Sequence, residues 1–586
     1  MAEAYGSEDK PKKMWSSSML DKEERECFDN TTARILALRE SRKDHYGVDL
    51  DVLWSEADRD YVPHRLRTKG KKMVVTDEDR GWRGALVQLG SNDWQSDVSQ
   101  SNPFVKIQTA LAILVDQNPT GVFSPVSKRY EKTTEIMKQL YQRTWEIARS
   151  RPQLELFVFN LAKYGWACAR TYPLKITRKV KIMTGYDPDD PQKATYEEKE
   201  VVEYNDVMRE NLDPRNVWID DMARPNSPLS LRDWCWRKVY DFDVFMDEFG
   251  KYKNAQFVQA GGTTTDVIDN PRNSGKPYVP GNKLVEVFFY ENRIKDKFVV
   301  IANGVPVILE PLPISDTSGN KKLSLWQTFW NLRHAESAYG IGIYEAIRYD
   351  QALLDRIRNM SIDQLTLSIY KMFFYQGTQA LTDTGDITIS PGVGRQVLDP
   401  KNISWLEVPG PGQEAWEGIE RFRKDVDESS GVGDPLLGTV TGKTAFEIAQ
   451  AREAALKRLK TPLNNILEAL NQEGYITISL IQLIYSIPET FKITDPDLID
   501  DYLKEVGGDA SLFERDEEGT FTALVYPEFN LNLEQDEAGN LVETPESSFF
   551  RLKPQFLKWE GIINIKAQSL LTPIKQIDKA LALQMY

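Results

Sequence analysis

Apolar residues recur at helical spacing in two stretches near the start of the chain, residues 16–60 and 104–164. In the second stretch, Ile107, Leu111 and Leu114 follow one another at intervals of three or four residues. An apolar stripe with this repeat is the pattern of a helix that buries one face against a core. The first part of the chain is therefore predicted to be mainly helical.

The period changes to two in the middle of the chain. Apolar residues such as Tyr172 and Leu174 alternate with polar ones, which is typical of a half-buried strand. Further on, Asn303-Gly304 separates two apolar runs, and this pair readily adopts the positive φ angles of a tight hairpin turn. Residues 165–330 are predicted to form a β-rich domain, which makes the chain an α+β protein.

Helical spacing returns at Ile343 and continues for about thirty residues, a length of about 45 Å in a helix. A short insert rich in glycine and proline follows at residues 375–408, and it is predicted to be β-like. A second amphipathic helix begins at Gln413, with Trp416 and Ile419 on one face. The predicted order of elements is helix, small insert, helix.

The next segment, residues 429–442, contains four glycines and one proline in fourteen residues. Each glycine would cost about 0.5 to 1 kcal/mol in a regular element, so this segment is predicted to be a loop. A long helical pattern follows over residues 443–487 and contains Pro462. Because an interior proline costs about 3 kcal/mol, a kink is expected near it. Residues 488–586 return to a mixture of loop, strand and helix patterns.

Composition narrows the chemistry of the chain. Its 586 residues include three cysteines outside any Cys-x-x-Cys spacing and three histidines, so no disulfide framework, metal or cofactor site is expected. The longest apolar runs, residues 110–115 and 480–485, are too short to span a bilayer. We therefore expect no membrane partner and a site of action in the cytoplasm, or inside a particle assembled there.

The charge of the chain argues against a protein that grips nucleic acid over a broad basic face. The formal net charge is −15, and the pI is about 5.1. Two local basic clusters, at residues 64–72 and at Lys457, Arg458 and Lys460, are interpreted as solvated faces or as contacts with a partner. A protein past which DNA slides remains compatible with this charge.

Gly442-Lys443-Thr444 looks like the end of a phosphate-binding loop. That loop requires a glycine five residues before Gly442, where this chain has Leu437, and Gly438 is one residue too close. The segment also follows an amphipathic helix instead of a buried strand. The residues fit a helix N-terminus better, with Thr441 or Thr444 as the capping residue.

A second short pattern, Asp189 followed by Glu197 and Lys199, matches the spacing of two-metal nucleases. Asp189 lies in a turn between two prolines, whereas such nucleases place their acids on buried strands. We interpret the pattern as a solvated hairpin tip. The sequence shows no other constellation of nucleophile, base and orienting residue, so no enzymatic activity is expected.

Four stretches and their order resemble the portal proteins of tailed bacteriophages, especially those of the short-tailed type. The resemblance covers roughly residues 100–586. The stretches are residues 211–223 (NLDPRNVWIDDMA), residues 337–342 (SAYGIG) with the helix behind them, the loop 429–442 that opens GKTAFEIAQAREAALKRL, and residues 561–581 (GIINIKAQSLLTPIKQIDKAL).

The resemblance implies a ring-forming portal-type fold with named parts. These are a wing, residues 1–335, with a helical N-terminal part and a β-rich part at 165–330; stem helix 1, 336–371; a small α/β clip, 372–412; stem helix 2, 413–428; a channel loop, 429–442; a kinked wing helix, 443–487; and a C-terminal crown region, 488–586. The family's long C-terminal barrel helix has no counterpart here, which suggests a short or truncated form.

The resemblance also implies a function and a set of partners. A dodecamer would sit at one capsid vertex of the virion, assembled in the host cytoplasm, and form the channel through which double-stranded DNA is packaged and ejected. Its implied partners are the terminase large subunit, the tail adaptor or head-tail connector protein, the major capsid protein and the scaffold. The residues expected to face DNA are Ser429, Ser430, Gly431, Val432, Gly433, Asp434, Pro435, Leu436, Leu437, Gly438, Thr439, Val440, Thr441 and Lys443.

The charge of the chain fits this role. Twelve copies would carry roughly −180 formal charges, and an acidic wall repels the phosphate backbone, so DNA would not stick while it moves. Two other classes stay open at this point. One is an ATP-driven terminase or other phosphate-loop enzyme, and the other is another virion structural protein, such as an adaptor or a capsid protein.

Overall fold

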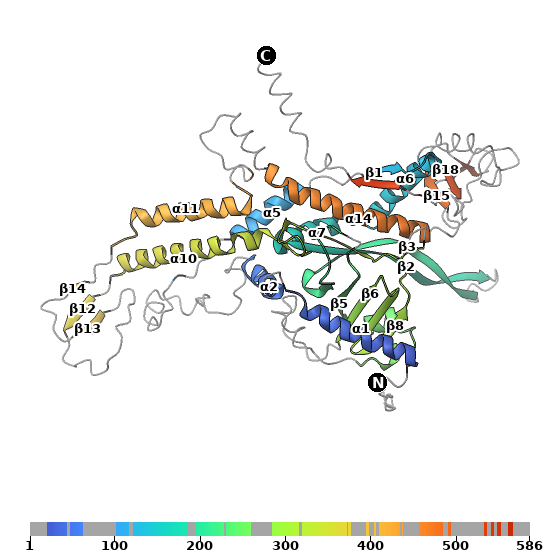
Figure 1. Cartoon of the computed structure of the whole chain (residues 1–586), viewed down its shortest axis with the longest axis horizontal. Helices are drawn as coiled ribbons and strands as arrows, with labels where there is room; N and C mark the ends of the chain where they lie inside the picture. Colours follow the sequence, from blue (N-terminus) through green and yellow to red (C-terminus); the bar gives the residue numbers. More distant parts are fainter. Residues whose placement is uncertain are drawn as a thin grey trace, which may run out of the picture.

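The structure of the chain is a computed structural model (Figure 1). It describes residues 20–43, 47–61, 96, 101–115, 121–185, 195–227, 230–259, 284–315, 319–371, 373–376, 394–397, 404–405, 409–433, 436, 456–484, 490–493, 533–535, 541–543, 548–551, 559 and 561–565. Within them the fold mixes helices and sheets, as the sequence predicts.

The N-terminal part is helical. At the start of its first helix, the backbone N–H of Asp21 donates to Glu24 at 3.2 Å as part of a capping box. The last of these helices ends at Gly165, which has a φ of 82°. The elements are α1 (Lys22–Glu40), α2 (Leu50–Tyr61), α5 (Asn102–Leu114), η4 (Lys128–Tyr130), α6 (Glu131–Ile147) and α7 (Ser150–Tyr164).

Two antiparallel sheets make up the middle of the chain. The first has the order β3-β2-β9, and its two long strands form a hairpin that extends away from the body (Figure 1). The second has the order β4-β5-β6-β7-β8. The strands are β2 (Trp166–Gly185), β3 (Thr195–Leu212), β4 (Val217–Ile219), β5 (Asp233–Asp241), β6 (Leu284–Asn292), β7 (Lys297–Ala302), β8 (Val305–Glu310) and β9 (Leu325–Phe329).

The predicted hairpin turn between β7 and β8 is confirmed. Asn303 has a φ of 44° and Gly304 a φ of 79°, as a type I′ turn requires. Short elements complete this region: η6 (Pro214–Asn216), α8 (Phe242–Phe249), η7 (Ala255–Phe257), β10 (Asn331–Leu332) and β11 (Gly340–Ile341).

Helix α14 (Lys460–Ile484) is the central buried helix of the body. Most of its residues are buried, and it packs on β2, β3, β9 and α6. Inside this contact, Arg209 of β3 donates to Glu473 of α14 at 2.6 Å, and Tyr141 of α6 donates to the other oxygen of the same carboxylate at 2.7 Å. Both charged side chains are almost fully buried, so this ion pair joins three elements in the core.

A pair of antiparallel helices leaves the body as an arm (Figure 1). They are α10 (Ile343–Ile369) and α11 (Gln413–Ser430). At the far end of the arm lies a small sheet with the order β13-β12-β14, formed by β12 (Phe373–Gln376), β13 (Gly394–Val397) and β14 (Ser404–Trp405). The predicted order of helix, small insert and helix is present.

The C-terminal part returns to the body. Strand β19 (Gly561–Ile565) pairs antiparallel with β1 (Gly121–Pro125), and the indole of the buried Trp559 donates to Thr134 of α6 at 2.8 Å. Two further strand pairs are β15 (Thr490–Ile493) with β18 (Ser548–Arg551), and β16 (Leu533–Gln535) with β17 (Leu541–Glu543).

The helical stretch that contains Pro462 is interrupted at Leu459, three residues before the proline. Residues 456–458 are helical, Leu459 is a turn residue, and α14 begins at Lys460. Pro462 therefore lies in the first turn of α14, where its missing N–H would have no intrahelical partner. Residues 443–455 lie outside the described part of the chain.

None of the helices in the described residues has the length and apolar character that a transmembrane span requires.

Candidate functional site

The site begins where the arm joins the body. At this junction the backbone of α7 and β2 crosses the backbone that leads into α10. A Cβ atom on Gly340 would lie 2.5 Å from the carbonyl oxygen of Gly165, and one on Gly342 would lie 2.6 Å from the nitrogen of Gly165. Only glycine permits so close an approach of two backbones. The SAYGIG stretch therefore fixes the start of α10 against the body.

Aromatic and charged side chains hold the same junction. Tyr339 is buried, with ring centroids 5.0 Å from Trp166 and 6.1 Å from Trp54, both edge to face. At the second residue of α10, the hydroxyl of Tyr344 donates to Asp60 of α2 at 2.8 Å. Arg348 also bonds Glu56 of α2 at 3.2 Å. These contacts give α10 a fixed direction as it leaves the body.

The second helix of the arm returns to the body and ends in a tight cap. Gly431 follows α11 with a φ of 71°, and its N–H donates to the carbonyl of Glu428 at 3.3 Å. The hydroxyl oxygen of Ser430 accepts a hydrogen bond from the N–H of Val432 at 3.0 Å. Ser429 donates to Asp350 of α10 at 2.8 Å. The end of α11 is thus tied to the start of the loop and to α10.

A buried lysine holds this end from the other side. Lys106 of α5 donates to the carboxylate of Asp427 and to the carbonyl of Val432, and only 2% of the residue is exposed. A cation at a helix C-terminus also interacts favourably with the helix dipole. The ammonium therefore fixes both the last turn of α11 and the first residues after it.

The two ends of the segment that follows lie next to each other. Arg458, which precedes α14, donates to the carbonyl of Glu428 at 3.4 Å. A Cβ atom on Gly431 would lie 3.9 Å from the Cβ of Arg458. The described residues on the two sides of positions 434–455 thus lie at one place at the base of the arm. We call this place the loop base and define it as residues 428–433 and 456–459.

The structure corrects part of the expected channel loop. Ser429 and Ser430 belong to the last turn of α11, because the helix continues until Gly431 supplies the left-handed cap. Val432 is fully buried in the main hydrophobic core, so it does not face an open channel. Leu436 is partly buried against the same core, and its N–H donates to the carbonyl oxygen of Gly433 at 3.0 Å. Asp434, Pro435, Leu437, Gly438, Thr439, Val440, Thr441 and Lys443 lie outside the described residues.

The two short chemical patterns of the sequence fall mostly outside the described part of the chain. This applies to the Gly442-Lys443-Thr444 segment and to Asp189, while Glu197 and Lys199 belong to β3. Among the described residues, no three His, Cys, Asp or Glu side chains are grouped closely enough to hold a metal ion.

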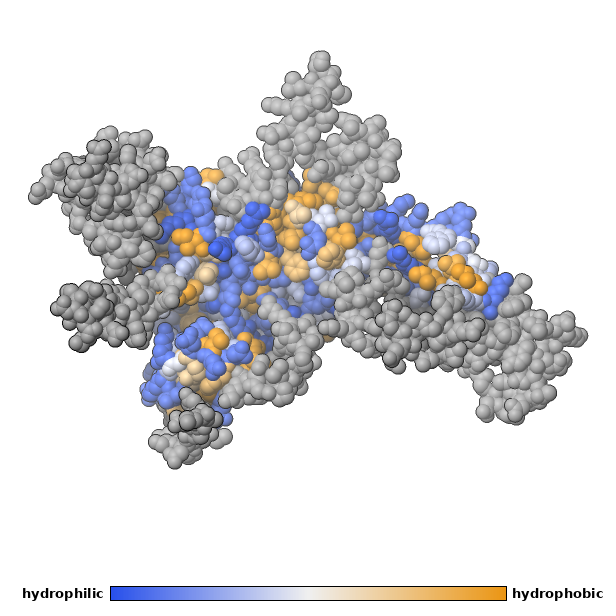
Figure 2. All heavy atoms as spheres, turned by 180° about the vertical axis from the view of Figure 1, so that it is seen from behind, coloured by the Kyte–Doolittle hydropathy of each residue, from blue (hydrophilic) through white to orange (hydrophobic). Residues whose placement is uncertain are grey.

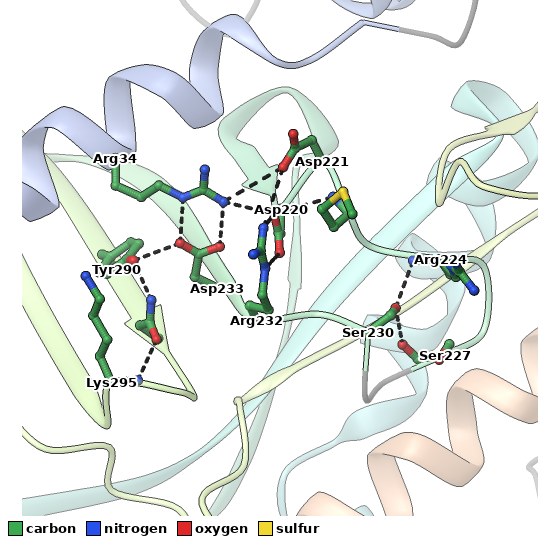
Figure 3. A network of polar contacts seen from close by, with 12 residues as sticks. Arg34, Asp220, Asp221, Arg224, Ser227, Ser230, Arg232, Asp233, Tyr290 and Lys295 are labelled. Carbon is green, nitrogen blue, oxygen red and sulfur yellow. Dashed lines mark hydrogen bonds and ion pairs between the residues drawn. The ribbon is translucent and has the colours of Figure 1, made fainter.

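A polar network links α1 to the five-stranded sheet (Figure 3). Arg34 donates to Asp220 at 2.9 Å and to Asp233 at 2.8 Å, and Arg232 donates to the other oxygen of Asp220 at 2.5 Å. Burial alone would raise the pKa of Asp220, but the hydrogen bonds from Arg232 and from the N–H of Met222 hold it well below its usual range. The Asp220 carboxylate is therefore kept ionised between two arginines.

The neighbouring acid behaves in the opposite way. The contact with ionised Asp220, followed by burial, raises the pKa of Asp221. A cavity of about 270 Å³ lies beside these two acids and is also lined by Lys43, Arg224 and Glu336. Because Asp220 is already paired with two arginines, we interpret this cluster as a junction between α1 and the sheet and not as a catalytic site.

Sequence reasoning missed Lys106. It is the one charged residue of α5, and it lies between Val105 and Ile107 in an otherwise apolar stretch. A lone lysine on a buried helix face implies a buried partner, because an unpaired buried charge is costly. The sequence contains this signal, but the partner lies 321 residues away.

Comparisons of the chain with protein-family models and with curated proteins gave no match.

Proposed function

We propose that this chain is a portal protein of the kind found in short-tailed bacteriophages. In this role, twelve copies form a ring at one capsid vertex, and double-stranded DNA enters and leaves the virion through the ring's channel. The observation that carries the proposal is the loop base: residues 428–433 and 456–459 lie next to each other, beside a helix pair that carries a small sheet at its tip.

Each part of the chain has a role under this proposal. Helices α10 and α11 form the stem, and the sheet of β12, β13 and β14 forms the clip, which meets the terminase large subunit during packaging and the tail adaptor afterwards. The β-rich body is the wing, which faces the major capsid protein and the scaffold. The segment after Leu436 projects into the channel.

The anchoring of the loop base supports this assignment. A loop that follows moving DNA needs fixed ends, so that its movement does not unfold the helices beside it. Lys106, Ser430 and Arg458 hold the two ends through hydrogen bonds to α11 and to Val432. The net charge of −15 per chain gives the ring a field that repels phosphate, which reduces the adhesion of passing DNA.

Two alternatives are less well supported. A phosphate-loop enzyme needs a glycine at position 437, where the chain has leucine, and a buried strand before its loop, where the chain has the exposed helix α11. An adaptor or a capsid protein requires no long loop closed at the base of a helix pair.

One preparation distinguishes the three classes. The purified full-length chain is imaged by negative-stain electron microscopy, and its ATP hydrolysis is measured in parallel. The proposal predicts free rings with a central hole and no turnover above buffer. Saturable hydrolysis that Lys443→Ala abolishes would establish the enzyme class instead. Shells or stacked collars without a through-hole would indicate another virion structural protein.

A further inference from the structure

Helix α10 has an exposed apolar side along the part of the arm nearer the body. Tyr349 is 69% exposed, Leu353 44% and Met360 60%. At about 100° per residue, these three side chains fall within an arc of about 40°. Of the other exposed residues between Ala346 and Met360, only Arg356 is charged. We call Tyr349, Leu353 and Met360 the inner stripe.

A second apolar group lies near the outer end of the arm. Leu365 is 43% exposed, Ile369 64% and Trp416 54%. Leu365 and Ile369 point about 160 to 200° away from Tyr349 around α10, on the other flank of the helix pair. We call Leu365, Ile369 and Trp416 the outer patch.

Helix geometry places Trp416 on the same flank. Val426 is buried in the core and Ser429 bonds to α10, so these residues mark the inward side of α11. Trp416 lies about a quarter turn from that side, and because the helices are antiparallel, the quarter turn leads to the flank of Leu365 and Ile369. Figure 2, which views the molecule from behind, shows hydrophobic atoms among hydrophilic ones on the arm.

Two different apolar groups on opposite flanks fit a head-to-tail contact. A two-fold dimer would bury one patch against itself and leave the other exposed, whereas a head-to-tail contact buries both and closes into a ring when the rotation allows. On the basis of the proposed function, we propose that the inner stripe of one copy packs against the outer patch of the next copy. The occupant of each patch is a second copy of this chain.

Charge supports the same pairing. Arg356 is exposed between Leu353 and Met360 of the inner stripe. Glu420 is exposed one helical turn after Trp416, beside the outer patch. Joining the two patches brings these opposite charges together, which favours the correct orientation of the copies. The apolar residues form the centre of the interface, where burial contributes most to affinity.

Two variants test the pairing, with a third as control. Leu353→Glu places a carboxylate in the inner stripe, and Ile369→Glu places one in the outer patch. Lys424→Glu adds a carboxylate at an exposed position of α11 on the side away from α10. Analytical ultracentrifugation is expected to show rings for the wild type and Lys424→Glu and monomers for the other two variants. The melting temperatures of the two monomeric variants are expected to agree with each other within about 3 °C, because both substituted residues are exposed.

Mixing the two monomeric variants gives the sharpest result. The Leu353→Glu copy keeps an intact outer patch and the Ile369→Glu copy an intact inner stripe, so an equimolar mixture is expected to form a heterodimer that grows no further. If the heterodimer does not form, or if either single variant forms rings, the proposed pairing is overturned. Rings of the wild type would still support the proposed function in that case. If a variant loses thermal stability but still forms rings, the chain covers its own patch, and this result also overturns the proposed pairing. A monomeric wild type would contradict both the pairing and the proposed portal function.

Discussion

The ammonium of Lys106 and the carbonyl of Val432 form a buried hydrogen bond between α5 and the first residues after α11. The same ammonium bonds Asp427 one turn earlier. A single side chain thus fixes the end of the arm and the beginning of the loop. This contact is the physical basis for treating the loop base as a rigid frame.

Removing the lysine is expected to loosen this frame. In Lys106→Met, the methylene stem is kept but Asp427 and the Val432 carbonyl lose their donor. We expect a loss of about 2 to 4 kcal/mol in the free energy of unfolding, measured by urea denaturation. The double variant Lys106→Met/Asp427→Asn should recover part of this loss, because no unpaired carboxylate remains. An unchanged unfolding curve for Lys106→Met would contradict the role of the clamp.

The crossing of Gly340 and Gly165 gives a second prediction. Gly340→Ala forces a methyl group against two carbonyl oxygens at 2.5 and 2.6 Å, so we expect a loss of about 3 kcal/mol or more. Gly418→Ala is the matched control, because that glycine lies inside α11 with open space around it. Its replacement should stabilise the chain by about 0.5 to 1 kcal/mol. Equal effects of the two substitutions on the melting temperature would refute the close crossing.

The acid pair of the body predicts a dependence of stability on pH. Because the folded pKa of Asp220 lies below its usual value of 3.8, its ionised form stabilises the fold above about pH 4. This contribution is lost as the pH falls through the folded pKa. Asp220→Asn should therefore cost about 1 to 3 kcal/mol at pH 7, and the difference from wild type should shrink towards pH 2.

Asp221→Asn serves as the comparison for this measurement. The contact with Asp220 raises the pKa of Asp221, and its side chain is 57% exposed, so we expect a change within about 0.5 kcal/mol at pH 7. Urea denaturation at a series of pH values gives both curves. A pH-independent difference between Asp220→Asn and wild type would show that ionisation of Asp220 does not contribute to stability.

Shortening the loop tests its independence from the fold. Asp434 to Thr439 are deleted and the ends are joined by Gly-Ser. Because the two sides of the loop base are already adjacent, we expect normal assembly, and because the deletion removes the partly buried Leu436, we expect a loss of stability of about 1 to 2 kcal/mol. Packaged DNA per particle is expected to fall. Loss of assembly would mean that the loop is a core connection, and normal DNA content with normal infectivity would mean that it has no role in transport.

Local patterns in the sequence predicted much of the fold. The Asn303-Gly304 turn and the helix that begins at Ile343 both depend on neighbouring residues, and both are present. The C-terminal end of α11 could also have been predicted from the neighbouring residues, because glycine is the common residue after the end of a helix and Gly431 occupies that position.

Contacts between distant segments could not be predicted in the same way. The pairing of β1 with β19 joins residues more than 400 positions apart, and the burial of Val432 depends on where α5 lies. The ion pair of Arg209 and Glu473 likewise needs β3 and α14 to be placed side by side. Such contacts are set by the tertiary arrangement, which the hydrophobic period of each segment does not specify.

The proposed portal function is tested most directly by a cryo-electron microscopy reconstruction of the assembled full-length chain. It shows the symmetry of the assembly and the position of the loop base relative to its axis. We predict a closed ring of twelve copies with the helix pairs side by side around an open channel and with the segments after Leu436 directed towards the axis. An assembly without a central channel, or a ring whose loop bases face outward, would contradict the proposed portal function.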